Sequence, residues 1–179
     1  MVVIGIYPFN KDHTLYSRRI IRTATIILLM CVFNQSSASA LVAAGWIEKA
    51  QVLPQGITLH AKLDTGAKTT SIHAPETEFY EKNGGRWVRF KLTDDNENAT
   101  VIEAKVVRDA KIKRHYGKQQ VRPVIMLEIC IGNIRKNEEV NLVDRSNLNY
   151  PLLVGRNFLK GAFLIDSGST YRLLPDCSD

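Results

Sequence analysis

The residues best suited to chemistry are Asp64, Thr65 and Gly66, which follow the alternating run Ile57 to Leu63. Such a run predicts a strand that delivers the Asp64 carboxylate into a turn, where Gly66 lets the backbone approach closely. When a second copy of the same loop lies alongside, the two carboxylates cannot both ionise easily, so they share a proton. One then activates a water as general base while the other gives a proton to a carbonyl oxygen. The triplet is therefore a candidate centre for amide hydrolysis, although the same three residue types also form ordinary turns.

A second segment of interest is Tyr150 to Leu159, in which apolar residues lead into Gly-Arg-Asn at 155–157. Together with the Asp-Thr-Gly triplet, it resembles the two signature segments of the retropepsin-like aspartic peptidases. In that family the apolar-Gly segment packs beside the Asp-Thr-Gly loop. The resemblance implies a catalytic loop of Asp64, Thr65 and Gly66, with structural roles beside it for Gly155 and Arg156.

The stretch Val124 to Gly132 resembles the strand that follows a retropepsin flap. That likeness places the flap hairpin at roughly Ala104 to Pro123, with its tip near His115-Tyr116-Gly117. It also implies substrate contacts from Ala67, Tyr116 and Gly117, although an exposed tyrosine without such a role is an equal alternative for Tyr116. The predicted hairpin is basic, which suits acidic substrates but is also typical of a solvated edge hairpin. Its basic residues are Lys111, Lys113, Arg114, Lys118 and Arg122.

Within that superfamily the chain looks closest to a bacterial group whose members often carry the label "ATP-dependent zinc protease". The segments that carry the likeness are 45–48, 61–74, 87–90 and 141–145. A phosphate loop requires Gly before its Lys, whereas Ala67 precedes Lys68. His60, His73 and His115 lack the H-E-x-x-H spacing of zinc peptidases. We therefore predict an aspartic mechanism with no cofactor and no metal, and a structural or surface role for His73.

The elements that must position these residues have mostly a period of two, which predicts strands. The resemblance implies an all-β fold: a single retropepsin-like (acid protease) closed β-barrel domain at 41–179, with a flap hairpin and one short C-terminal helix. That helix is expected at Arg156 to Lys160, and we expect Trp46 and Trp87 in the core. The β-rich runs lie at 57–63, 87–92, 101–107, 124–131, 140–143, 163–165 and 171–174.

A single Asp64 loop implies a homodimer, in which each chain contributes one carboxylate across a two-fold axis. Asp166, in Asp166-Ser167-Gly168, also resembles a catalytic triplet, but only 13 residues follow it. That is too few for the second lobe of a pepsin-like enzyme, so Asp166 is predicted to be a strand or turn residue. Viral retropepsins carry an acidic residue where this chain has Lys68, which leaves the partner of Arg156 open.

The first forty residues have the pattern of a secretory signal peptide: basic residues, an uncharged run from Thr23 to Phe33, and Ala38-Ser39-Ala40 before the expected cleavage. An uncleaved N-terminal anchor is the alternative. We therefore expect a periplasmic or secreted protein in a bacterium, with no other membrane association. In that compartment Cys130 and Cys177 could pair, or remain two unrelated thiols.

The net charge of +6 does not indicate a nucleic-acid partner, because half of it falls within the first forty residues. The expected function is an exported aspartic endopeptidase that hydrolyses peptide bonds in peptide or protein substrates. The alternative is a non-catalytic retropepsin-fold domain that binds a peptide or an envelope partner. A generic β-barrel ligand binder leaves the Gly-Arg-Asn segment unexplained.

Overall fold

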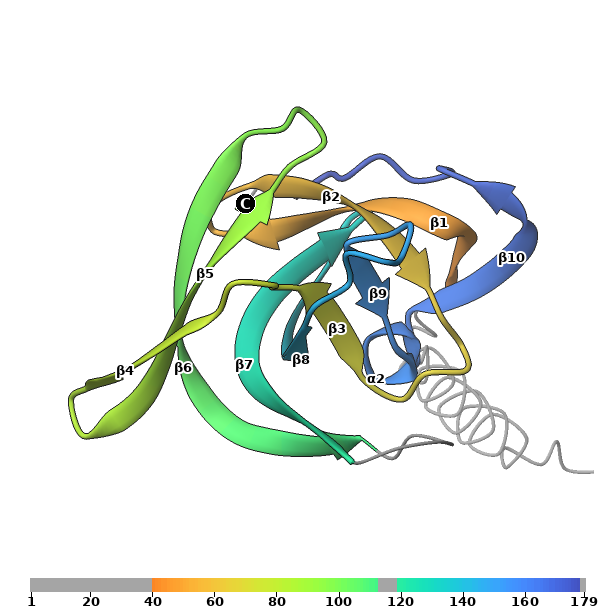
Figure 1. The fold of residues 1–179 in the computed structure, drawn as a ribbon. Coiled ribbons are helices and arrows are strands. Elements are labelled where there is room, and N and C mark those ends of the chain that lie inside the picture. Colours follow the sequence, from red (N-terminus) through yellow and green to blue (C-terminus); the bar gives the residue numbers. More distant parts are fainter. Residues whose placement is uncertain (1–39, 113–118, 178–179) are drawn as a thin grey trace, which may run out of the picture. The chain divides into compact units, whose positions relative to one another are not determined.

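The computed structural model describes residues 40–112 and 119–177 (Figure 1). The predicted signal peptide, apart from its last residue Ala40, and the predicted flap-tip residues His115, Tyr116 and Gly117 lie outside these ranges. Ten strands and one short helix are described: β1 (Val42–Leu53), β2 (Ile57–Leu63), β3 (Thr70–His73), β4 (Glu78–Lys82), β5 (Gly85–Thr93), β6 (Ala99–Ile112), β7 (Gln120–Ile131), β8 (Ile134–Val143), β9 (Leu152–Val154), α2 (Arg156–Leu159) and β10 (Phe163–Thr170).

The strands form one sheet in the order β10-β1-β2-β9-β3-β8-β7-β6-β5-β4. The first strand pairs with β2 and β10 and also with β7, where Ala50 lies opposite Ile131. That extra pairing closes β1, β2, β9, β3, β8 and β7 into a six-stranded barrel, visible in the centre of Figure 1. The predicted all-β, retropepsin-like barrel with a flap hairpin and one short helix is confirmed.

Alternation along the strands places apolar side chains inside the barrel. Every second residue of β2 from Ile57 to Leu63 is buried, and Ile125, Ile129 and Ile131 of β7 pack in the same core. Where the predicted turn Asn83-Gly84-Gly85 lies, Asn83 and Gly84 both have positive φ, as a tight β4–β5 hairpin requires. Sequence patterns did not predict β1, β3 or β4.

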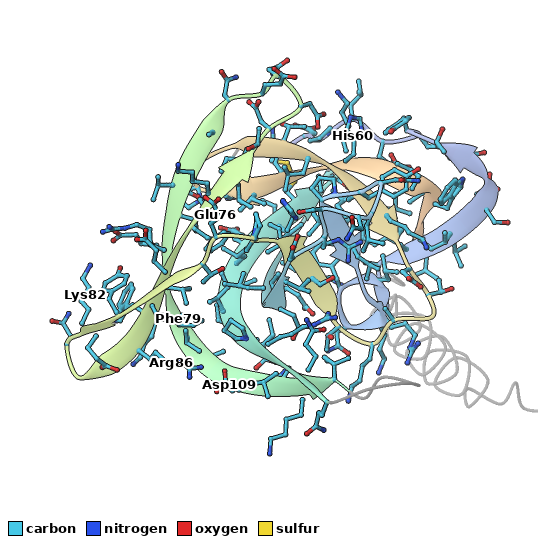
Figure 2. All side chains as sticks on the ribbon, viewed as in Figure 1. His60, Glu76, Phe79, Lys82, Arg86 and Asp109 are labelled. Carbon is cyan, nitrogen blue, oxygen red and sulfur yellow. A yellow bond between two sulfur atoms is a disulfide. The ribbon has the colours of Figure 1, made fainter. Side chains whose placement is uncertain are left out.

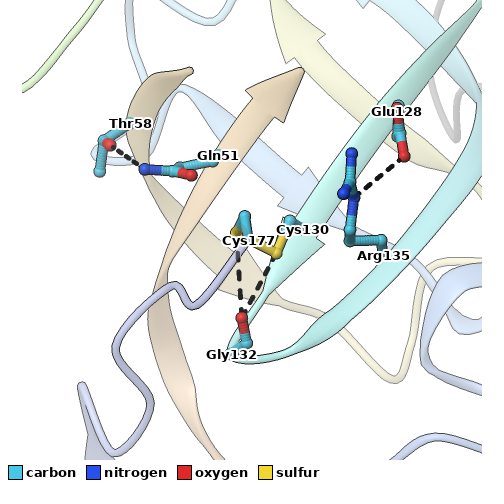
Figure 3. The surroundings of a disulfide bond; sticks show 7 residues. All are labelled: Gln51, Thr58, Glu128, Cys130, Gly132, Arg135 and Cys177. Atoms are coloured by element: carbon cyan, nitrogen blue, oxygen red, sulfur yellow. Dashed lines mark hydrogen bonds and ion pairs between the residues drawn. A yellow bond between two sulfur atoms is a disulfide. The ribbon is translucent and has the colours of Figure 1, made fainter. Parts of the chain in front are cut away.

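One predicted strand is wrong. Residues 171–174 form an extended C-terminal tail rather than a strand. The backbone amides of Arg172 and Leu173 donate to the carboxyl group of Glu48, at 3.1 and 3.0 Å, instead of to a neighbouring strand. The tail is further attached by a disulfide between Cys130 and Cys177, whose sulfurs lie 3.3 and 3.9 Å from the Gly132 carbonyl oxygen (Figure 3). The alternative of two unrelated thiols is therefore wrong.

Glu48 is fully buried and also accepts a 2.6 Å hydrogen bond from the Gly45 amide. Glu48→Ala leaves three backbone donors without this acceptor, so we expect a loss of about 3 kcal/mol in the free energy of unfolding, measured by urea denaturation. The control is Glu128→Ala, which removes only an exposed pair with Arg135 at 3.2 Å and should cost less than about 1 kcal/mol. Equal losses in both variants would contradict a structural role for Glu48.

Beyond the barrel, β4, β5 and the first half of β6 extend as an arm (Figure 1). Figure 2 shows the labelled side chains of Phe79, Lys82 and Arg86 along this arm. Cations lie over aromatic rings there, with Lys82 4.8 Å from the Trp87 ring centre and Arg86 5.7 Å from that of Phe79. Trp87 is therefore partly exposed on the arm rather than in the core. The long β6–β7 hairpin continues from the arm as the flap candidate.

Candidate active site

The Asp64 loop begins where β2 ends. The Asp64 amide donates to the Val154 carbonyl of β9 at 2.9 Å, which ties the start of the loop to the Tyr150–Leu159 segment. One carboxylate oxygen, Oδ1, accepts from the amides of Gly66 at 2.9 Å and Ala67 at 3.2 Å. The other, Oδ2, lies 3.9 Å from Lys62 Nζ, and the side chain is 27% exposed. One oxygen is thus held by the loop, while the other belongs to a partly exposed side chain and lies near a lysine, and a carboxylate of this kind can take a proton from water.

Gly155 and Arg156 hold this loop from the other side. The Arg156 guanidinium donates from Nη1 to the carbonyls of Thr65 and Gly66, at 2.9 and 2.8 Å, and the Arg156 amide donates to Ala67. These carbonyls are the partner that the sequence left open, since Lys68 cannot pair with an arginine. A Cβ added to Gly155 would lie 2.6 to 2.8 Å from backbone atoms of Thr69, so only glycine allows this approach.

Gly155→Ala is expected to lower the free energy of unfolding by about 2 kcal/mol or more and to displace the Asp64 loop, because the contacting atoms are backbone. Thermal unfolding and peptide cleavage measure the two effects. Gly168→Ala is the matched control: its new Cβ would meet nothing closer than Asp166 Oδ1 at 3.4 Å. A Gly155→Ala protein as stable as that control would show that the close approach is not needed.

One cross-strand row lies beside Asp64 on the outer face of the barrel. The strand registers place these residues opposite one another in turn: Lys62 (β2), Leu153 (β9), Ser71 (β3), Asn141 (β8), Val124 (β7) and Arg108 (β6). Asn141 is buried and donates to Thr69 Oγ1 and to the Thr70 carbonyl, at 2.8 and 2.9 Å. The row therefore connects the flap strand to the chain that follows the Asp64 loop.

A pocket of about 490 Å³ opens beside this row. Its lining residues are Trp46, Lys62, Arg145, Asn147, Leu148, Asn149, Tyr150 and Leu153. Trp46 and Tyr150 meet edge to face with ring centres 6.1 Å apart, so Trp46 belongs to the pocket wall rather than to the core. Burial, together with the nearby charge of Arg122, lowers the pKa of Arg145, while the Asp64 carboxylate acts in the opposite direction.

A second hollow, of about 550 Å³, lies on the other side of the loop. Thr65, Lys68 and Arg156 line it together with Phe163, Leu164 and other residues of α2 and β10. Leu164 is 58% exposed there and adds apolar surface beside the polar loop.

The remaining sequence candidates have local partners. Asp166 lies in β10, and its carboxylate accepts from the Gly168 amide, the Ser169 hydroxyl and Arg172, which together lower the pKa of Asp166. His73 Nδ1 accepts from the Arg145 amide at 3.0 Å, which fits a structural role. Within 40–112 and 119–177, no three His, Cys, Asp or Glu side chains are grouped as metal ligands would be. No helix of these ranges is long and apolar enough to cross a membrane.

Sequence reasoning missed two residues of this region, Lys62 and Arg145. For Lys62 a signal was present, because alternation along β2 buries Ala61 and Leu63 and places Lys62 on the outer face of the strand. Asp64 follows two residues later, so the same alternation predicts it on the same side as Lys62. No comparable signal existed for Arg145, which lies in the loop after β8.

A closed barrel whose second strand runs into Asp-Thr-Gly beside an apolar-Gly segment defines the retropepsin-like class. The chain belongs to the RimB-like family, described as "Retropepsin-like aspartic endopeptidase RimB", whose model matches residues 43–173. The solved structure of protein Lpg0085 from Legionella pneumophila, of unknown function, is 34% identical with a TM-score of 0.64. That similarity covers 74% of this chain and 98% of the Legionella chain.

Curated relatives match over a shorter segment. Proteins named "Probable alpha-L-glutamate ligase" are 31% identical over 118 residues in Shewanella pealeana and 27% identical over 118 residues in Parasynechococcus marenigrum. Each match covers 64% of this chain but only 26% and 25% of those proteins. The matching segment thus spans about a quarter of the relatives.

Proposed function

We propose that the chain is an exported aspartic endopeptidase, in which two Asp64 carboxylates from a homodimer activate one water. The observation that carries this proposal is the Asp64 loop itself, with Oδ1 held by two amides and Oδ2 3.9 Å from Lys62 Nζ in a partly exposed side chain. In such a dyad one carboxylate takes a proton from water while the other protonates the scissile carbonyl oxygen. Arg156 and Gly155 hold the loop in place and do not touch the reacting atoms.

The homodimer is supported by two features of this chain. Asp166 is engaged by its own neighbours, so it is unsuited to be the second carboxylate. The hollow lined by Thr65 and Leu164 presents apolar surface next to the catalytic loop, where a second copy would both cover Leu164 and bring its own Asp64 close.

Export is supported by the disulfide between Cys130 and Cys177, because such bonds persist in oxidising compartments such as the periplasm. The signal-peptide pattern of the first forty residues agrees with this location.

Acidic peptides are the substrate class that we propose. Lys62 and Arg145 line the pocket beside Asp64, and Lys68 follows the loop. The relatives named for glutamate ligation include a segment similar to this chain, which gives independent support for glutamate-containing peptides.

The experiment is to express the full chain, recover it after any processing in the cell, and incubate it with a diverse peptide mixture between pH 4 and 8. Mass spectrometry should detect discrete internal cleavages. Peptide binding without cleavage by a dimeric protein would favour the non-catalytic binding domain instead.

A further inference from the structure

Arg145 is a buried cation with no carboxylate at ion-pair distance in the described part of the chain, and the Asp64 carboxylate acts on it only from further away. It is 8% exposed, and its guanidinium donates from Nε to the Tyr150 carbonyl at 2.9 Å and from Nη1 to Ser71 Oγ at 3.1 Å. Both acceptors are neutral, and no described carboxylate lies within 4.0 Å of it. Burial of an unpaired charge is costly, so buried charges in proteins usually have an ionic partner.

The position of Arg145 indicates where that partner would come from. Arg145 and Lys62 line the same pocket, and Lys62 Nζ lies 3.9 Å from Asp64 Oδ2. Asp64 attracts Arg145 only from beyond 4.0 Å, since its Oδ1 is held by the loop amides and its Oδ2 lies 3.9 Å from Lys62. The pocket is open, holds about 490 Å³, and has aromatic walls in Trp46 and Tyr150. It has room for one whole side chain of a bound peptide.

We infer that Arg145 and Lys62 form a carboxylate-binding subsite, which selects an acidic side chain next to the scissile bond. This inference rests on the proposed function and adds to it the residues that determine specificity. Arg145, held by Ser71 and Tyr150, is fixed in orientation and supplies directed donors. Lys62, on the exposed end of β2, supplies a second charge between the subsite and Asp64. A glutamine in the same place would keep the shape but lose the ionic attraction.

The test uses peptides that differ only by Glu or Gln at one position, scanned on both sides of the cleaved bond. We expect kcat/KM to favour Glu by about ten-fold or more, at one or two positions adjacent to the bond, because hydrogen bonds to charged groups are the stronger ones. The same ratio at every position would indicate general attraction by net charge and would overturn the subsite. Equal rates for Glu and Gln peptides would also overturn it.

The variants separate specificity from folding. Lys62→Gln should reduce the Glu preference and Lys62→Glu should reduce it further, because the new carboxylate opposes the charge of Arg145. Thermal unfolding should be unchanged in both variants, because Lys62 is 41% exposed. Arg145→Lys should reduce the preference further, provided that its unfolding curve matches the wild type. The matched control is Lys91→Gln, an exposed strand lysine on β5 that does not line this pocket. If the control changes the preference as much as Lys62→Gln, the inference is wrong.

A binding measurement distinguishes failure of the subsite from failure of the proposed function. Fluorescence anisotropy of a labelled Glu peptide and its Gln counterpart is measured with Asp64→Asn, with and without Lys62→Gln. Tighter binding of the Glu peptide that depends on Lys62 supports the subsite even if no peptide is ever cleaved. Cleavage by the wild type, with equal binding of both peptides, would retain the enzyme and reject the subsite.

Discussion

Asp64→Asn is expected to lower kcat/KM for peptide cleavage by about 1,000-fold or more. Asparagine retains the size of the side chain and can still accept the loop hydrogen bonds, but it cannot take a proton from water or share one with a second carboxylate. Because Oδ1 contributes only two loop hydrogen bonds at a partly exposed position, the protein should remain folded. Cleavage products are measured by mass spectrometry and folding by thermal unfolding.

The matched control is Asp166→Asn, which changes the other Asp-x-Gly triplet of the chain. Its carboxylate is occupied by Gly168, Ser169 and Arg172, so we expect cleavage to continue at the wild-type rate. Loss of activity in Asp166→Asn with retention in Asp64→Asn would reverse the assignment. Cleavage that survives in both variants would point to a contaminant or another nucleophile.

Mixing tests the dimer separately. When excess Asp64→Asn protein is added to a fixed amount of wild type, mixed dimers carry a single Asp64, and the wild-type activity should fall as the two proteins exchange chains. Unchanged activity under exchanging conditions would contradict a dyad shared between chains, while the loss of activity in Asp64→Asn alone would still stand.

Removing the disulfide should have the largest effect on stability. Cys130 and Cys177 are 47 residues apart, and a cross-link that closes such a loop restricts the unfolded chain by about 4 kcal/mol in the chain-entropy model. The double variant Cys130→Ser, Cys177→Ser should therefore unfold about 10 °C lower in a thermal scan. The tail amides that donate to Glu48 should also exchange hydrogen faster, because the end of the tail is no longer attached.

Reductant provides the control for this prediction. It should lower the unfolding temperature of the wild type to that of the double variant and leave the double variant unchanged. An oxidised wild type that unfolds at the same temperature as the double variant would show that the tail is held by Glu48 and packing alone.

The sequence by itself determined the local parts of this protein. Alternation predicted β2 and β5 because one buried face requires a period of two, and the predicted turn at Asn83-Gly84 forms because both residues tolerate positive φ. The catalytic candidate was evident as well, since the Asp-Thr-Gly triplet and its apolar-Gly partner are each contiguous. Their resemblance to a known family then implied that the two segments meet.

Only the tertiary structure decided the long-range contacts. Barrel closure depends on β1 meeting β7, and the tail that resembled a strand is instead bound by Glu48, some 124 residues earlier in the chain. The disulfide is another long-range contact, and so is the hydrogen bond that Arg145 donates to Ser71, 74 residues away in the sequence. Such contacts leave no periodic trace in the sequence, because each depends on where the folded barrel brings distant residues together. The candidate subsite beside Asp64 is therefore a property of the fold, whereas Asp64 itself is a property of the sequence.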